Sequence, residues 1–242
     1  MSFFPRLIVA LRKPVVMVVK KPTPLTYIGA GRLRQAAELL RQTGSRRVLV
    51  MTTPGMMRRG QLDQTLSELK ENGMEAVVFD RVSPDPTFGV VEEAVSCAAG
   101  CDAILAVGGG SVCDYAKAVS VSVFCNEDAW DKYFDRFEDV DNPIVPVGCV
   151  LTMAGTGSEM NGGSVITNRE KKLKIGHVFG ENVFPKFSVL NPEFTMTVPR
   201  YQMISGIYDI MSHILEQYFS GTDDNTSDYI MEGLLKSKNS AE

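Results

Sequence analysis

The stretch that most constrains the fold is Ala103–Ser122, in which an apolar run meets three consecutive glycines and then a helical pattern. The run from Ala103 to Val107 is typical of a buried strand, and Ser111 opens the helix. Glycine lets the backbone approach an anion closely, and the first turn of a helix presents free N–H groups and a positive dipole end. The stretch therefore predicts a phosphate-binding turn, although a tight strand-to-helix turn without a ligand would have the same signature.

Strand and helix patterns alternate at short intervals around this turn. Predicted strands cover Val15–Val19, Val48–Met51, Val77–Phe79, Ala103–Val107, Pro143–Val150 and Ser188–Leu190. The alternation predicts an α/β fold with a doubly wound parallel sheet, a Rossmann-like dinucleotide-binding domain. Ligands of such sheets lie beyond the carboxyl ends of the strands. Three loops fall at such ends and favour a nucleotide site: Thr52–Gly55, Ser83–Thr87 and Gly108–Ser111.

The last part of the chain has a different pattern. Val165–Thr167 predicts a strand with a hairpin tip after it, whereas Tyr201–Phe219 is a long helical pattern with no strand signal. We therefore expect an α/β domain over residues 1–198 and the beginning of an all-helical domain over 199–242. The acidic and aromatic stretch Glu127–Asn142 predicts a surface loop or a short helix.

Composition excludes several classes of function. The 242 residues carry a net charge of −4 without a basic block, so no nucleic-acid partner is expected. Charged residues and a proline interrupt the apolar segment Leu7–Val19, so no membrane span is expected either. The five cysteines form no CxxC pair, which indicates reduced thiols and a cytoplasmic location.

Asp209 and His213 form a second candidate constellation. Their i,i+4 spacing places both side chains on one helical face, where a carboxylate and an imidazole can bind a divalent transition metal. A hydrogen bond between the two side chains, or a cap, is the alternative. The other histidine, His177, is expected in a loop or strand and not as a ligand.

Three motifs in this order resemble the iron-containing (group III metal-dependent) alcohol dehydrogenase family, and more closely its butanol-dehydrogenase-like branch: GGGSVCDYAK, LTMAGTGSEMNGGSVITN and DIMSHILEQY. The resemblance implies a dinucleotide-binding domain, a helical domain and an active site between them. It also implies hydride transfer between a nicotinamide cofactor and a small primary alcohol or aldehyde. A glycerol or sugar-phosphate enzyme of the dehydroquinate-synthase type is an alternative on the same fold.

Carried over position by position, the resemblance implies a set of site residues. The pyrophosphate would lie on Gly108, Gly109, Gly110 and Ser111, with Asp114 near the nicotinamide and Asp85 on the adenosine side. The remaining cofactor-binding residues would be Thr53, Thr152, Thr156, Ser158 and Lys174. Asp209 and His213 would be the first two of four ligands of an iron or zinc ion.

The family draws its other two metal ligands, both histidines, from farther along the helical domain. No histidine follows His213, so we expect a truncated chain with half of a metal site. Two functions stay open on this basis. One is an NAD(P)-dependent, metal-dependent alcohol dehydrogenase or aldehyde reductase, and the other is a truncated, non-catalytic nucleotide-binding remnant of that family.

Cofactor preference and association follow from two further features. The loop after the second strand has no acidic residue to bind a ribose 2′-hydroxyl, and Arg58 and Arg59 follow it, so NADP is favoured over NAD. A solvated helix face is the alternative for these arginines. The helical segment would leave apolar side chains uncovered, which predicts a homo-oligomer or poor solubility: Ile207, Ile214, Leu215 and Phe219.

Overall fold

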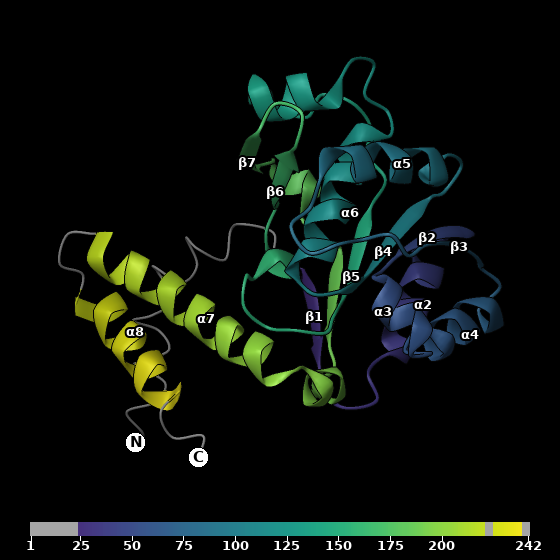
Figure 1. The fold of residues 1–242 in the computed structure, drawn as a ribbon. Helices are drawn as coiled ribbons and strands as arrows, with labels where there is room; N and C mark the ends of the chain where they lie inside the picture. The colour runs from purple at the N-terminus through teal and green to yellow at the C-terminus, as the bar shows by residue number, and fades with distance from the viewer. Residues whose placement is uncertain (1–23, 221–224, 239–242) are drawn as a thin grey trace, which may run out of the picture.

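The computed structural model describes residues 24–220 and 225–238 (Figure 1). The predicted strand Val15–Val19 lies outside the described residues. Six parallel strands form one sheet in the order β1 (Leu25–Ile28), β8 (Phe187–Leu190), β5 (Val147–Leu151), β4 (Ala103–Gly108), β2 (Arg47–Met51) and β3 (Glu75–Phe79). All six residues of β4 are buried, as expected for a central parallel strand. The predicted doubly wound α/β fold is confirmed.

Helices cover both faces of the sheet. One face packs against α2 (Arg34–Gln42), α3 (Pro54–Arg58) and α4 (Asp63–Glu71), and the other against α5 (Phe88–Ala98) and α6 (Gly110–Ser122). The two faces of the sheet thus have separate hydrophobic cores. β5 begins at Val147 and not at Pro143 as predicted, because Pro146 has no N–H for the ladder.

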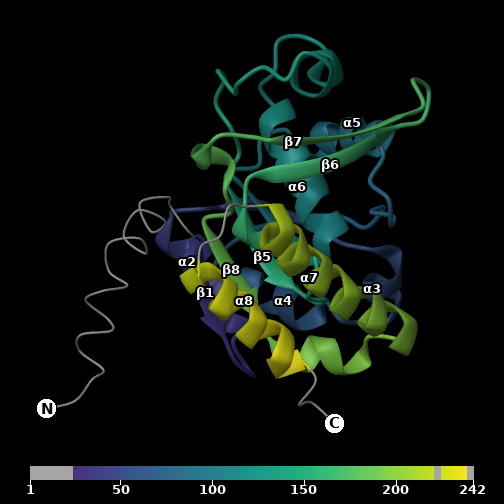
Figure 2. The ribbon, with the colours of Figure 1, turned by 90° about the vertical axis from the view of Figure 1, so that its left-hand side faces the viewer.

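An antiparallel hairpin, β6 (Gly163–Asn168) and β7 (Leu173–Val178), lies over α6 (Figure 2). Beside it, the segment 127–142 contains a short π-helix, η1 (Asp131–Asp135). The expected short helix is present. The expectation that this segment lies at the surface is wrong for its aromatic side chains. Trp130 and Phe134 are buried and stack with ring centroids 5.2 Å apart, because rings of this size are stabilised by burial.

In the described residues, short 3₁₀ turns follow β5, β7 and β8, namely η2 (Ser158–Met160), η3 (Glu181–Val183) and η4 (Pro192–Thr197), and two helices come last. These helices, α7 (Arg200–Ser220) and α8 (Asn225–Lys238), pack against each other beside the sheet (Figures 1 and 2). Gly206 is the buried residue of α7. A Cβ there would lie 2.5 Å from the Ala154 carbonyl oxygen, so glycine permits a close approach of α7 to the loop after β5.

Candidate functional site

The glycine turn between β4 and α6 is built by close packing. A Cβ on Gly110 would lie 2.8 Å from Cγ2 of Thr156, and one on Gly108 would lie 2.9 Å from Cβ of Val112. A Cβ on Gly109 would meet nothing nearer than Met153, at 3.7 Å. Gly109 is the N-cap of α6, and no side chain caps this helix. The turn therefore presents open backbone at a helix N-terminus, which is the geometry that suits an anion such as a pyrophosphate.

A cleft of about 280 Å³, here called the arginine cleft, opens on one side of this turn. Gly108, Gly109 and Thr152 line it together with Thr53 and Arg59. Thr53 caps α3 by accepting a hydrogen bond from the Met56 N–H at 3.3 Å. The Arg59 Nε donates to Gln61 Oε1 at 3.1 Å, and Arg58, which is exposed like Arg59, does not line the cleft.

A second cleft of about 250 Å³, here called the aspartate cleft, opens on the other side of the turn. Gly110 and Thr156 line it together with Asp209 of α7, and Met153 lines both clefts. The Asp209 carboxylate faces Gly155, where a Cβ would lie 3.1 Å from Oδ2. The two clefts therefore meet at the glycine turn, and the packing of α7 brings Asp209 to the second of them.

Asp209 and His213 share a helical face as their spacing predicts. His213 Nε2 lies 3.7 Å from Asp209 Oδ1, and both side chains are substantially exposed. These are suitable ligand types for iron or zinc, but two ligands do not make a metal site. Within residues 24–220 and 225–238, no group of three or more His, Cys, Asp and Glu side chains is arranged to bind a metal. His177 lies in β7, where its Nδ1 is 2.5 Å from the Tyr133 carbonyl oxygen.

Asp114 and Ser158 lie behind the wall of the aspartate cleft and line neither cleft. The Ser158 hydroxyl donates to Asp114 Oδ1 at 2.5 Å, and the Val165 N–H donates to Oδ2 at 3.1 Å. Burial raises the pKa of the Asp114 carboxyl, and nearby Lys117 opposes that shift. Lys117 is completely buried in this network, and no site role was predicted for it. The available signal was a lysine three residues after Asp114 in a helix whose other residues are apolar or small.

Asp85 and Lys174 form an ion pair with each other. Lys174 Nζ lies 2.8 Å from Asp85 Oδ1, which also accepts a hydrogen bond from the Thr167 hydroxyl at 3.0 Å. These hydrogen bonds lower the pKa of Asp85. Neither residue lines the arginine or aspartate cleft, and Ser111 is simply the second residue of α6. The structure thus brings together the glycines, Thr53, Thr152, Thr156 and Asp209, and places the Asp85–Lys174 pair at the hairpin.

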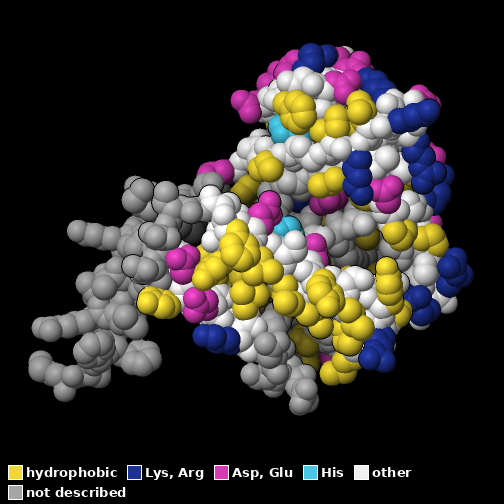
Figure 3. All heavy atoms as spheres, turned by 60° about the vertical axis from the view of Figure 1, so that its left-hand side comes forward, with side chains coloured by type: hydrophobic (Ala, Val, Ile, Leu, Met, Phe, Trp, Pro, Cys, Tyr) yellow, Lys and Arg dark blue, Asp and Glu magenta, His cyan; other side chains and the backbone are white. Residues whose placement is uncertain are grey.

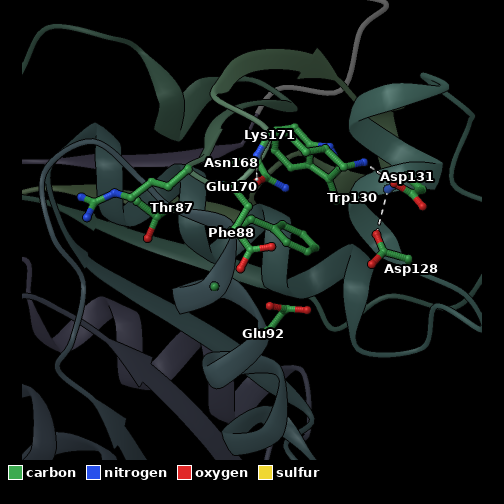
Figure 4. Close-up of a pocket in the computed structure, with 11 residues that line it drawn as sticks. Thr87, Phe88, Glu92, Asp128, Trp130, Asp131, Asn168, Glu170 and Lys171 are labelled. Carbon is green, nitrogen blue, oxygen red and sulfur yellow. Dashed lines mark hydrogen bonds and ion pairs between the residues drawn. The ribbon is translucent and has the colours of Figure 1, made fainter.

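A third cleft, of about 280 Å³, lies between the start of α5, the segment before η1 and the hairpin tip (Figure 4). Lys171 from the tip forms ion pairs with Asp131 and Asp135 at 2.6 and 2.5 Å. On the α5 side, burial and the charges of Asp128 and Glu170 raise the pKa of Glu92. The ion pairs of Lys171 join the hairpin tip to η1. The third cleft shares no lining residue with the arginine or aspartate cleft.

Among the helices of the described residues, none has the length and apolar character needed to cross a membrane.

Comparison with known proteins identifies relatives of this chain. The chain is 41% identical over 205 residues to the probable NADH-dependent butanol dehydrogenase 2 of Bacillus subtilis, covering 84% of this chain and 51% of that protein. It is 35% identical over 195 residues to the NADPH-dependent aldehyde reductase YqhD of Escherichia coli, covering 78% of this chain and 49% of that protein.

The fold agrees with these relatives. The crystal structure of an NADH-dependent butanol dehydrogenase A from Thermotoga maritima superposes with a TM-score of 0.82 at 36% identity, covering 88% of this chain and 54% of that one. The chain therefore spans about half the length of the relatives that it matches. The family pattern of the iron-containing alcohol dehydrogenases matches residues 23–192. On this evidence, the chain belongs to the iron-containing alcohol dehydrogenase family.

Proposed function

We propose that the chain binds a nicotinamide dinucleotide across the glycine turn and is the cofactor-binding part of an NAD(P)-dependent alcohol dehydrogenase or aldehyde reductase. The observation that carries this proposal is the meeting of two clefts at Gly108–Gly110, with Arg59 at one end and Asp209 at the other. The adenosine half would lie in the arginine cleft and the nicotinamide half in the aspartate cleft. This orientation sets the nicotinamide toward α7, on the side of the Asp209–His213 pair.

The chain's own residues would bind and orient the cofactor. The uncapped N-terminus of α6 would hold the pyrophosphate, with Ser111 in the same turn, and Thr152 and Thr156 would border it on either side. The bound dinucleotide supplies the hydride chemistry, passing hydride to an aldehyde or taking it from a small primary alcohol. Asp114, Ser158, Asp85 and Lys174 would act indirectly, since they line neither cleft.

Asp209 and His213 would contribute two ligands to an iron or zinc ion. The described residues provide no third ligand beside them. We also propose a division into an α/β domain, residues 1–198, and the start of a helical domain, 199–242. The single buried residue of α7 supports this division, because α7 adds little to the α/β cores.

We propose NADP(H) as the preferred cofactor. Arg59 lines the arginine cleft, and a guanidinium there would pair with a ribose 2′-phosphate. Asp80 and Asp85, the carboxylates of the loop after β3, line neither cleft, so neither would repel a 2′-phosphate beside Arg59. The relatives' names include both an NADH-dependent and an NADPH-dependent enzyme, so the preference rests on Arg59.

Titration of the purified chain with NADPH and NADH, followed by cofactor fluorescence, tests this function. We expect saturable binding of both, tighter for NADPH, and absence of binding would refute the proposal. Metal analysis and an aldehyde-reduction assay on the same sample distinguish a metal-dependent enzyme from a non-catalytic nucleotide-binding chain. Stoichiometric metal with turnover would support the enzyme. Dinucleotide binding without metal and without turnover would support the non-catalytic alternative, which the two-ligand arrangement of Asp209 and His213 suggests.

We also propose that the chain forms a homo-oligomer through the exposed side of α7 and α8. Large hydrophobic side chains gather along these helices (Figure 3), including Tyr208, Phe219, Tyr229 and Ile230. Exposed apolar patches of this kind are typical of interaction surfaces. We further propose a cytoplasmic location, which the five free cysteines support.

A further inference from the structure

The buried amine of Lys117 is bound almost entirely by one turn of the chain. Its Nζ donates to the carbonyl oxygen and the hydroxyl of Ser158, both at 2.8 Å, and to the carbonyl oxygen and Oδ1 of Asn161 at 3.2 and 3.3 Å. The Asp114 carboxylate is farther away, at 3.7 Å. A buried charge is costly unless hydrogen bonds and an opposite charge compensate it. The residues 158–161 are therefore held to α6 by the need to solvate this amine.

The same turn supports the wall of the aspartate cleft. The Ser158 N–H donates to Thr156 Oγ1 at 3.3 Å, and Thr156 packs into the space that a side chain on Gly110 would need. The Ser158 hydroxyl, which accepts from Lys117, donates in turn to Asp114. A continuous set of contacts thus runs from Lys117 through Ser158 and Thr156 to the glycine turn.

We propose that Lys117 is a positioning residue for the nicotinamide side of the dinucleotide site. Lys117 lines neither cleft, so its influence passes through Ser158 and Thr156. The inference rests on the proposed dinucleotide binding. A lysine suits the position because one ammonium group carries three donors that can reach several oxygens at once. A methionine of similar length would leave the Ser158 and Asn161 carbonyl oxygens without this donor.

The test compares Lys117→Met with Ser120→Ala, a matched control on the same helix. Ser120 is also buried, but its hydroxyl donates to the Val145 carbonyl oxygen, away from residues 156–161. The probes are the dinucleotide that the unaltered chain binds more tightly and its adenosine half alone, 2′,5′-ADP for NADPH or ADP for NADH. We expect Lys117→Met to weaken dinucleotide binding by about tenfold or more and the adenosine half by less than about threefold. The control should change neither by more than about twofold.

Ser158→Ala is the second variant, in case Lys117→Met does not fold. It removes one acceptor but leaves the ammonium its three other oxygens, so the fold should persist. We expect a smaller but still selective loss, about threefold for the dinucleotide and none for the adenosine half. Equal weakening of both probes, or unchanged binding by folded variants, would overturn the positioning role. Failure of the unaltered chain to bind any dinucleotide is a separate result, because it refutes the proposed function itself.

Discussion

Arg59 lines the arginine cleft and Arg58 beside it does not, although both residues are exposed. The difference follows from the short helix α3, which ends at Arg58 and turns Arg59 toward Gln61 and Gly55. A guanidinium that lines a cleft is placed to pair with an anion bound there, whereas a guanidinium outside the cleft is not. The two neighbouring arginines thus form a matched pair for testing cofactor preference.

We expect Arg59→Ala to weaken NADPH binding by about tenfold, equivalent to about 1.4 kcal/mol, and NADH binding by less than about twofold. Arg58→Ala should change neither affinity by more than about twofold. Fluorescence titrations of both variants measure these values. An equal loss for the two cofactors in Arg59→Ala would show that Arg59 does not recognise a 2′-phosphate.

At the scale of elements, the packing between β5 and β8 depends on one glycine. Gly148 pairs with Phe187 in the parallel register, and the Phe187 ring occupies the space above it. A Cβ on Gly148 would lie 2.5 Å from Cε1 of that ring. β5 adjoins β4 in the sheet, so a shift of the ring against β5 would be transmitted toward the strand that carries the glycine turn.

We expect Gly148→Ala to lower the free energy of unfolding by about 1–3 kcal/mol, because the added methyl overpacks the core. Gly89→Ala is the control, since a Cβ there meets no atom within 4 Å in the first turn of α5. The control should raise stability by about 0.5–1 kcal/mol, as glycine disfavours helix. Urea denaturation followed by circular dichroism gives both values, and an unaffected Gly148→Ala would contradict the packing described.

At the scale of the whole molecule, the apolar side chains of α7 and α8 dominate one surface (Figure 3). Phe219 and Tyr229 are 77% and 71% exposed, although both side chains are large and apolar. Covering them removes apolar area from water, with a gain of about 25 cal/mol per Å². This gain is the physical basis for the proposed self-association.

We expect the unaltered chain to sediment as a species larger than its 26.6 kDa monomer. The double variant Phe219→Glu with Ile230→Glu should shift the distribution toward monomer, because charged side chains resist burial. Val178→Glu, on the exposed strand β7, is the control and should leave association unchanged. A monodisperse monomer of the unaltered chain in sedimentation velocity would refute the oligomer.

The sequence by itself determined the features that depend on neighbouring residues. The apolar run before Gly108 predicts a buried strand, the glycines predict the turn, and i,i+4 spacing predicts that Asp209 and His213 share a face. Local periodicity and backbone freedom decide such features, so contiguous residues are sufficient. The confirmed fold class follows from the same local patterns repeated along the chain.

Only the tertiary structure decided which distant residues meet. Lys117 binds residues 41 and 44 positions later, and Lys174 pairs with Asp85 across 89 positions. The burial of Trp130 and the choice of Arg59 over Arg58 also depend on how elements pack. Hydrophobic periodicity indicates which face of an element is buried but not what covers it. The partners of a buried charge or ring are therefore settled by the packing of helices and loops around the sheet.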